Sequence, residues 1–320
     1  MELERYVTSF DGTRLYTRAG GRQKDHQGWP LVLCDGLGCA GFIWRYLIPA
    51  FVETHRIVHF HYRGHGLSDP PTDPNALDIP TFRDDLQAVM DAHGLDRAVL
   101  IGHSMGVQVA LDTALAHPER VAGLVAICGS YGHPLDAIHG DDRWASIFPP
   151  VRDAFLLFPQ AGQVFWRRLL SSPWLRRFAM RFEVNGRLLR SSDFAPYFEH
   201  LASMDVRVFM RLLERIRLHT VEDRLSEIEV PTLIVAGEKD TLTPVWLSHR
   251  MHMLMPHAEL LVMPGGTHVA PLEIPELVHL RLRQFLREGM PPKKRGGSRK
   301  TTARSAPGTR RSRRSSVGGD

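Results

Sequence analysis

Short apolar runs alternate with helix-like stretches along the first 129 residues, and this alternation is the feature that most restricts the fold. Four runs are bounded by glycines or charges, as strands buried on both faces of a parallel sheet are: residues 31–34, 57–60, 98–101 and 124–127. Helix-like stretches lie between them at 44–51, 81–93 and 105–117. The pattern predicts an α/β fold with a mainly parallel sheet. An Asp11-Gly12 turn between residues 5–9 and 14–18 predicts a β-hairpin in front of it.

The character of the sequence changes between residues 130 and 225. Strand-like runs stop there and are replaced by amphipathic stretches rich in aromatic residues and arginine. This change predicts an all-helical insertion over residues 130–225, with most of its large apolar side chains packed into a core of its own. Strand-like runs return at 231–236 and 259–263, and helices are predicted at 244–255 and 275–288. Residues 1–129 and 226–290 are therefore expected to form one α/β core.

Positive charge is concentrated at the end of the chain. Residues 291–320 hold ten lysines and arginines and one acid, so this segment carries +9 and residues 1–290 carry −4. A segment with so few apolar residues cannot offset the entropy lost on ordering, and we expect a disordered basic tail. It could bind nucleic acid, anionic lipid or an acidic partner. Because no aromatic residue interleaves its charges, we favour a solubilising extension and expect no specific nucleic-acid partner.

Three further features bear on where the protein works. The sequence has no run of 18 apolar residues, so no transmembrane helix is predicted. Its first five residues are mostly charged, so no signal peptide is expected. Three cysteines (Cys34, Cys39 and Cys128) are too few, and odd in number, for a disulfide framework. Together these features predict a cytoplasmic protein.

The most specific motif is Gly102-His103-Ser104-Met105-Gly106, which directly follows one predicted strand and directly precedes a helix. A G-x-S-x-G sequence in this position holds the serine on a strained strand-to-helix turn, with its oxygen above the sheet. Glycines flank the serine because a β-carbon there would clash with the neighbouring strand and helix. The helix also directs free N–H groups at the site, where they stabilise developing negative charge. We therefore expect Ser104 to be a nucleophile.

A serine nucleophile needs a base, and the base needs an anion to orient it. Among 17 histidines, His268 stands out because it lies on a glycine-containing loop after the last predicted strand. Asp240 follows the penultimate strand in the same way, and the order Ser104, Asp240, His268 is the one that this type of fold uses. Glu238 is a rival carboxylate that we expect to be solvated. The loop after the strand at 124–127 offers no carboxylate before Asp136.

A tetrahedral intermediate of acyl transfer needs hydrogen-bond donors for its oxyanion. One donor is expected to be the backbone N–H of Met105, the residue after the nucleophile. The other is expected from the loop after residues 31–34, which reads Asp35-Gly36-Leu37-Gly38, and the amide of Leu37 is the candidate. Glycines in this loop let the backbone turn and approach a substrate carbonyl.

With these motifs together, residues 5–288 resemble a serine α/β-hydrolase of the esterase/lipase type, with a helical cap inserted after the sixth strand. The stretch Tyr62-Arg63-Gly64-His65-Gly66-Leu67-Ser68 is similar to the R-G-x-G-x-S turn after that family's fourth strand, and we expect it to be structural. The resemblance implies an α/β-hydrolase fold, in which helices flank a mostly parallel sheet. One departure is Asp35, where the family usually has histidine. We expect Asp35 to form hydrogen bonds with nearby groups, since buried polar groups are normally satisfied locally. If its carboxylate faced the active site instead, its negative charge would destabilise the oxyanion of the transition state.

Other titratable groups have structural explanations that we favour. His59 and His61 share a strand face near His65, but no cysteine or carboxylate completes a metal site at ligand spacing, so we expect bonds to neighbouring loops. The cysteines lack the base partner of a catalytic thiol. Asp84 and Asp85 are expected in the first turn of a helix, where carboxylates complement its dipole. We expect no metal and no cofactor.

These features predict an enzyme that hydrolyses carboxylic esters through an acyl-enzyme. An apolar cap favours a small-to-medium hydrophobic, uncharged substrate. Several cap arginines could instead meet a carboxylate: Arg167, Arg168, Arg176 and Arg177. The same triad also suits a thioesterase, a C–C bond hydrolase, an acyltransferase or a cofactor-free haloperoxidase. The alternative from another class is a hydrolase-fold receptor that binds a small apolar ligand and signals through its cap.

Overall fold

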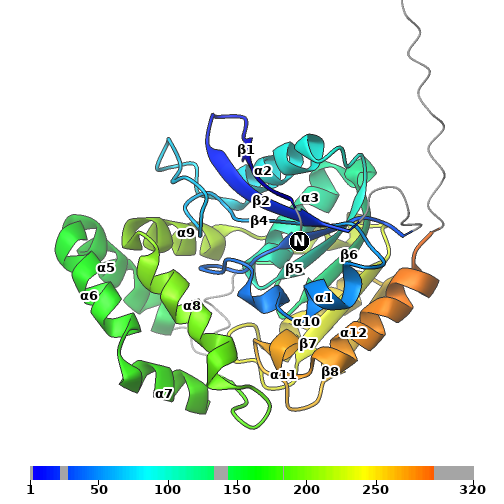
Figure 1. Ribbon diagram of the computed structural model, residues 1–320. Helices are drawn as coiled ribbons and strands as arrows, with labels where there is room; N and C mark the ends of the chain where they lie inside the picture. The colour runs from blue at the N-terminus through cyan, green and yellow to red at the C-terminus, as the bar shows by residue number, and fades with distance from the viewer. Residues whose placement is uncertain (1–2, 22–27, 133–142, 183, 292–320) are drawn as a thin grey trace, which may run out of the picture.

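An eight-stranded sheet runs through the computed structural model, which describes residues 3–21, 28–132, 143–182 and 184–291 (Figure 1). Its strands lie in the order β1-β2-β4-β3-β5-β6-β7-β8. They are β1 (Leu3–Thr8), β2 (Arg14–Gly20), β3 (Leu31–Cys34), β4 (Ile57–Phe60), β5 (Ala98–His103), β6 (Val121–Ile127), β7 (Thr232–Gly237) and β8 (Ala258–Met263). The pairs β1–β2 and β2–β4 are antiparallel, and every other neighbouring pair is parallel. The predicted hairpin and mainly parallel sheet are both confirmed.

Helices cover both faces of this sheet. On one face lie α2 (Ile79–Ala92), α3 (Met105–Ala116) and α10 (Val245–Leu254), and on the other lie α1 (Leu47–Phe51) and α12 (Pro275–Gln284). Shorter helical segments are η1 (Phe42–Trp44), η2 (Pro118–Arg120), η4 (Glu222–Glu227), α11 (Ala270–Glu273) and the π-helical η5 (Phe285–Gly289). The single helix predicted at 44–51 is therefore two short ones. Among the described residues, no helix combines the length and apolar character needed to cross a bilayer.

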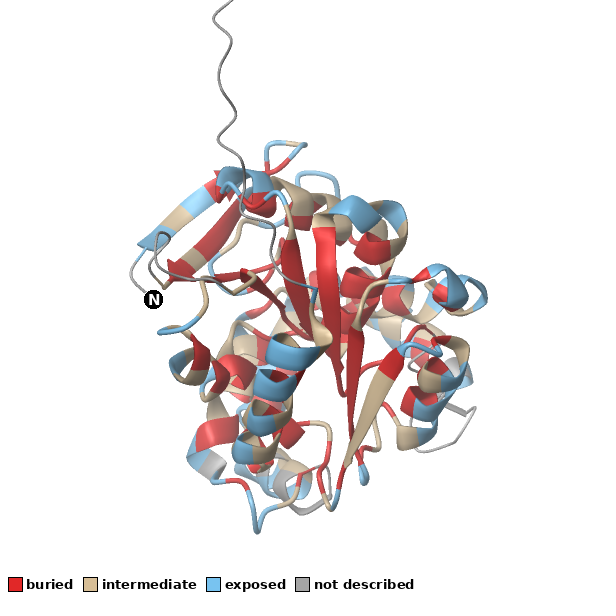
Figure 2. Ribbon diagram, turned by 90° about the vertical axis from the view of Figure 1, so that its right-hand side faces the viewer, coloured by how far each residue is buried: buried red, intermediate tan, exposed pale blue. Residues whose placement is uncertain are grey.

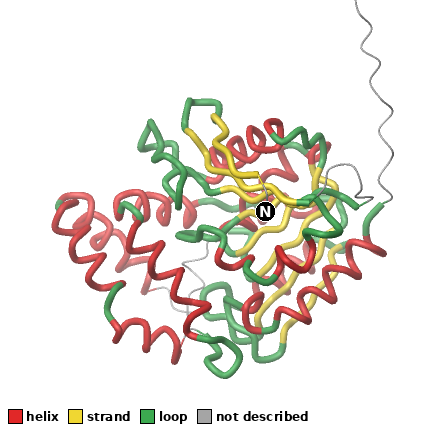
Figure 3. Tube along the Cα trace, viewed as in Figure 1, coloured by secondary structure: helices red, strands yellow, loops and turns green. Residues whose placement is uncertain are grey.

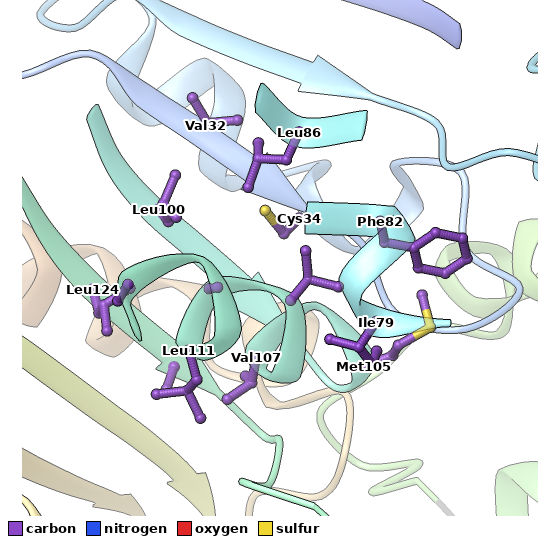
Figure 4. Close-up of a cluster of buried hydrophobic side chains, with 14 of the residues drawn as sticks. Val32, Cys34, Ile79, Phe82, Leu86, Leu100, Met105, Val107, Leu111 and Leu124 are labelled. Atoms are coloured by element: carbon purple, nitrogen blue, oxygen red, sulfur yellow. The ribbon is translucent and has the colours of Figure 1, made fainter. Parts of the chain in front are cut away.

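The central strands are buried on both faces, which is why the sequence shows continuous apolar runs there instead of alternation. Every residue of β3, β4, β5, β6 and β7 is buried, and the strands are red in the middle of Figure 2. On one face, Val32 and Leu100 of the sheet pack with Phe82 and Leu86 of α2 and Val107 of α3 (Figure 4). This packing fixes α3 against the sheet, and so fixes the turn from β5 into α3.

Five α-helices of the described residues lie between β6 and β7 and form a helical insertion beside the sheet (Figures 1 and 3). They are α5 (Arg143–Leu157), α6 (Pro159–Leu170), α7 (Pro173–Phe182), α8 (Ser191–Ser203) and α9 (Val206–Leu218). At its base, Gly132 pairs with Thr220 in a β-bridge and the Val221 N–H donates to the Tyr131 carbonyl. The insertion is confirmed, whereas its limits at residues 130 and 225 stay a prediction. The basic tail lies outside the described residues from 292 onward, so its disorder stays a prediction as well.

The expectation that Asp84 and Asp85 lie in the first turn of a helix is wrong. α2 begins at Ile79, two residues before the predicted start, because Asp78 caps it and accepts the Thr81 N–H at 2.9 Å. Both aspartates therefore lie in the second turn, beyond the free N–H groups that carry the dipole effect. Asp85 is fully buried there and serves an ion pair instead.

Arg63, from the Arg-Gly turn after β4, is the partner of Asp85. Its guanidinium donates to the Asp85 carboxylate at 2.8 and 2.6 Å and to Asp11 in the β1–β2 turn at 2.7 Å. The Ser9 hydroxyl also donates to Asp85. Burial raises the pKa of Asp85, and the Arg63 charge opposes that shift. The turn thus ties the hairpin to α2, which fits the structural role predicted for it.

Replacing Arg63 by methionine is expected to lower the free energy of unfolding by about 3–5 kcal/mol, because a buried carboxylate would lose its countercharge. Urea unfolding followed by circular dichroism measures this change. Arg14→Met is the matched control, since Arg14 pairs with Asp69 at 2.8 Å on the exposed surface and should matter little. Equal effects of the two substitutions would contradict the role assigned to burial.

Candidate active site

The serine of the G-x-S-x-G motif lies between β5 and α3 in a conformation that few residues other than glycine adopt. Ser104 has φ 55° and ψ −120°, and backbone strain of this kind recurs at functional sites. A β-carbon on Gly106 would lie 2.1 Å from the Cys34 carbonyl oxygen. One on Gly102 would lie 2.4 Å from the Gly106 carbonyl oxygen. Close backbone approach therefore requires both flanking glycines, as the motif predicts.

Three side chains from distant parts of the sequence meet at this turn. His268 Nε2 lies 3.0 Å from Ser104 Oγ, and His268 Nδ1 lies 2.9 Å from Asp240 Oδ2. Ser104 follows β5, Asp240 follows β7 and His268 follows β8. The carboxyl ends of these parallel strands share one edge of the sheet, where ligands of open α/β sheets bind. The structure brings together the serine, histidine and aspartate that the sequence analysis selected.

Asp240 is held in place by donors from its own loop. It is 5% exposed, and its carboxylate accepts the Leu242 and Thr243 N–H groups at 2.9 and 2.8 Å and the Thr243 hydroxyl at 2.7 Å. The rival Glu238 is exposed and accepts the Gly265 N–H at 2.7 Å. Glu238 therefore braces the histidine loop, while Asp240 contacts the histidine itself. Asp136, named as the first carboxylate of another loop, lies outside the described residues.

Glu273, which the sequence analysis did not single out, also holds the histidine loop. Its carboxylate is buried and accepts the Thr267 N–H and the Thr267 hydroxyl, each at 2.7 Å. It also accepts the Asn185 N–H at 2.7 Å, and the Asn185 amide donates to the Gly265 carbonyl at 3.0 Å. One carboxylate thus ties the residue before His268 to the helical insertion. A lone glutamate between apolar residues gave no sign of this role in the sequence.

The two predicted oxyanion donors line the same cavity as Ser104. Met105 is the first residue of α3, and the first N–H groups of a helix have no partner within it. Leu37 lies in the loop after β3, where Gly38 turns the backbone with φ 69°. A β-carbon on Gly36 would lie 3.0 Å from Ser104 Cβ, so this loop passes directly beside the serine.

Asp35 is fully buried and does not line this cavity. Its carboxylate accepts the Gly41 N–H at 3.0 Å and the Trp44 indole N–H at 2.6 Å, and it lies 2.8 Å from His59 Nε2. Burial opposes its charge, but His59 and the Trp44 N–H together hold the pKa of Asp35 below its usual value. Asp35 therefore bonds locally, as expected, and supports the oxyanion loop from behind. His61 likewise bonds a neighbouring loop by accepting the Leu67 N–H at 3.0 Å.

The cavity above Ser104 has a volume of about 240 Å³ and is mainly apolar. The insertion contributes Val184, Phe194, Tyr197, Leu213 and Ile216 to its wall. The rest of the wall comes from Gly36, Leu37, Cys39, Phe42, His103, Ser104, Met105, Gln108, Ser130, Leu242, Thr243, His268 and Val269. No aspartate, glutamate, lysine or arginine of the described residues lines it. The cap arginines Arg167, Arg168 and Arg177 are exposed instead, and nothing is described of the Arg176 side chain.

A family model described as the alpha/beta hydrolase fold matches residues 30–275, which is most of the 320 residues. The chain belongs to the α/β-hydrolase family. The resemblance seen in the motifs is thereby confirmed, together with the helical insertion in the sheet fold. The family is also the one in which the order serine, aspartate, histidine is usual.

Relatives of this α/β hydrolase carry names from several hydrolase groups. "Putative carbamate hydrolase RutD" from Caulobacter sp. (strain K31) is 29% identical over 271 residues, which cover 83% of this chain and 93% of the relative. The solved structure of Est816, described as an N-acyl homoserine lactone degrading enzyme, is 28% identical with a TM-score of 0.69, covering 88% of this chain and all of that one. The enol-lactonase from Burkholderia xenovorans LB400 shares the fold at 19% identity, with a TM-score of 0.73 and coverage of 89% and 100%.

Three buried histidines of this hydrolase are held neutral. Burial lowers the pKa of His61 to about 3 and those of His65 and His103 to about 4. His103 precedes the serine, and its Nε2 donates to the His268 carbonyl at 2.9 Å. His65 Nδ1 donates to the Arg63 carbonyl at 3.1 Å. Each ring therefore bonds as a neutral imidazole in the folded chain.

Stability of this hydrolase is expected to fall as the pH drops from about 6.5 to about 4. In that window the unfolded chain binds protons on these histidines, whereas the folded chain keeps them neutral, so acid favours unfolding. Urea midpoints measured across the window test this. His65→Gln should flatten the slope, and His249→Gln on the exposed surface should leave it unchanged. A midpoint independent of pH would contradict the burial of these rings.

Proposed function

We propose that Ser104, His268 and Asp240 form the catalytic triad of an enzyme that hydrolyses carboxylic esters of small-to-medium hydrophobic compounds. The observation that carries the proposal is the hydrogen-bonded chain from Ser104 Oγ through His268 to Asp240, at 3.0 and 2.9 Å, in the wall of an apolar cavity. The family supports hydrolysis in general. The choice of an ester rests on the cavity and on the triad.

The geometry suits acyl transfer in two steps. His268 Nε2 takes the Ser104 proton while Ser104 Oγ forms a bond to the substrate carbonyl carbon. The backbone N–H groups of Leu37 and Met105 stabilise the oxyanion, and Asp240 stabilises the imidazolium. As the intermediate collapses, the bond to the alcohol breaks and His268 returns the proton to it. Water then attacks the acyl-enzyme by the same route, so the reaction needs no cofactor.

The cavity walls favour an uncharged substrate. No aspartate, glutamate, lysine or arginine of the described residues lines them, so a substrate carboxylate would be buried there without a lysine or arginine to balance its charge. Carbamates and lactones, which appear in the names of relatives, place an ester-like carbonyl in a small molecule. We assign residues 130–225 to the cap and residues 1–129 and 226–290 to the core that carries the triad. A cytoplasmic location completes the proposal.

The test is hydrolysis of a graded series of p-nitrophenyl esters from acetate to laurate. The purified protein is run beside Ser104→Ala and beside a form that ends at Met290. We expect turnover that disappears in Ser104→Ala, persists without the tail and falls for the longest chains, because the cavity is only about 240 Å³. Absence of turnover on every ester, with the protein folded, would contradict the proposal and favour C–C cleavage, acyl transfer or ligand sensing.

A further inference from the structure

The helical insertion exposes large apolar side chains on α5, α6 and α7 and directly after α5. Leu157 is 73% exposed at the end of α5, and Phe158 is 67% exposed directly after it. Phe165 of α6 and Trp174 of α7 are 57% and 70% exposed. These helices form the part of the insertion furthest from the sheet (Figure 1). We call these four residues, with Leu169 of α6, the outer cap face.

This face is distinct from the core of the insertion. On α6, Trp166 and Leu170 are buried, and the Trp166 indole donates to the Leu201 carbonyl of α8 at 2.7 Å. Phe165 precedes Trp166, and Leu169 precedes Leu170. Phe165 and Leu169 are one turn apart and lie on the exposed side of the helix. The helix thus carries a buried apolar side and an exposed apolar side, and on the exposed side the Phe165 ring is only partly covered, with its centroid 6.2 Å from that of Phe155. A second apolar face of this kind on a folded protein marks an interaction surface.

The segment that carries the outer cap face is strongly basic. Residues 143–190 contain nine arginines, no lysine and two acids (Asp153 and Glu183), a net charge of +7. Since residues 1–290 as a whole carry −4, the rest of that body carries −11. Arg167, Arg168 and Arg177 are exposed, and in the described part of the chain none of them forms an ion pair. The guanidinium groups of Arg167, Arg168 and Arg177 therefore have no acidic partner in the described part of the chain, whereas Arg152 of α5 pairs with Asp153 and Glu214.

We propose that the outer cap face binds the surface of an anionic lipid bilayer. Amphipathic helices that carry aromatic side chains and arginines insert the former at the headgroup boundary, while the latter attract acidic lipids. A second copy of this chain fits worse, because two copies of a segment with a net charge of +7 would repel one another. Nucleic acid would meet the arginines but leave the aliphatic Leu157 and Leu169 exposed. The protein would lie on the bilayer and not cross it.

Vesicle flotation tests the proposal without using enzymatic turnover. The full chain is mixed with phosphatidylcholine vesicles that contain or lack phosphatidylglycerol. We expect binding only to the anionic vesicles, and we expect it to persist in a form ending at Met290, which removes the basic tail. Trp174→Ser combined with Phe158→Ser should weaken binding at least about tenfold, since each loses the burial of a large apolar side chain.

Trp246→Ser is the matched control. Trp246 is 51% exposed on α10, which packs on the sheet and not in the insertion, so its loss should leave binding unchanged. Absence of binding to anionic vesicles would overturn the proposal. So would binding that disappears with the tail alone, or binding that the Trp246 and Trp174 variants weaken equally. Sedimentation showing a dimer that the Trp174 and Phe158 substitutions dissociate would assign the face to a second copy instead.

Discussion

Ser104→Ala is expected to lower kcat for p-nitrophenyl esters by about 10⁵- to 10⁶-fold, because no other group can form the acyl-enzyme. The side chain lost is small and lies at a turn that the flanking backbone holds, so the fold should be kept. Residual turnover above that of water would come from binding and from the oxyanion donors alone. Circular dichroism and thermal unfolding check that the variant is folded.

Ser130→Ala is the matched control for this substitution. Ser130 lines the same cavity, but its hydroxyl donates to the Gly132 carbonyl at 3.1 Å instead of contacting His268. Its loss should therefore leave most of the turnover in place. If Ser130→Ala abolished turnover while Ser104→Ala kept it, the assignment of the nucleophile would be wrong.

Asp240→Asn is expected to lower kcat by about 10³- to 10⁴-fold with little change in fold. An amide in this place cannot stabilise the imidazolium, and its NH₂ group directed at Nδ1 favours the wrong tautomer of His268. The neighbouring hydrogen-bond donors should increase this loss of kcat. The Leu242 and Thr243 N–H groups fix one carboxylate oxygen, so an asparagine is held with its carbonyl toward them and its NH₂ toward the histidine.

Glu238→Gln separates this role from that of the nearest rival. Glu238 lies on the same loop but braces the Gly265 N–H at 2.7 Å, so glutamine can accept that bond and should keep most activity. A steady-state comparison of the two variants on one ester measures the difference. Greater loss in Glu238→Gln than in Asp240→Asn would contradict the triad.

The α/β architecture and the grouping of three site residues were predictable because local patterns encode them. Continuous apolar runs mark strands buried on both faces, and parallel strands end at a common edge. Residues in the loops after β5, β7 and β8 therefore converge whatever lies between them in the sequence. The G-x-S-x-G motif was informative because a close backbone contact requires its glycines. A β-carbon added to Gly106 would lie only 2.1 Å from the Cys34 carbonyl oxygen.

The buried polar contacts could not be predicted, because each joins residues whose spacing carries no pattern. The sequence predicts Asp85 in the first turn of a helix, but the structure pairs it with Arg63 from the turn after β4. Glu273 bonds Thr267 nearby and Asn185 across the interface with the insertion, and neither contact has a sequence signature. The outer cap face could not be predicted from the sequence for a related reason. Helical periodicity marks apolar positions, but not which of two apolar faces is buried.

The most direct test of the central claim is covalent labelling with a fluorophosphonate, which transfers its phosphonyl group to a serine activated by a triad. Fluoride leaves as the bond from the serine oxygen to phosphorus forms. Intact-protein mass spectrometry with peptide mapping then locates the adduct. We predict one adduct, on Ser104, absent from Ser104→Ala and formed much more slowly in Asp240→Asn. A folded protein that takes up no label, or takes it up on another residue, would contradict the account.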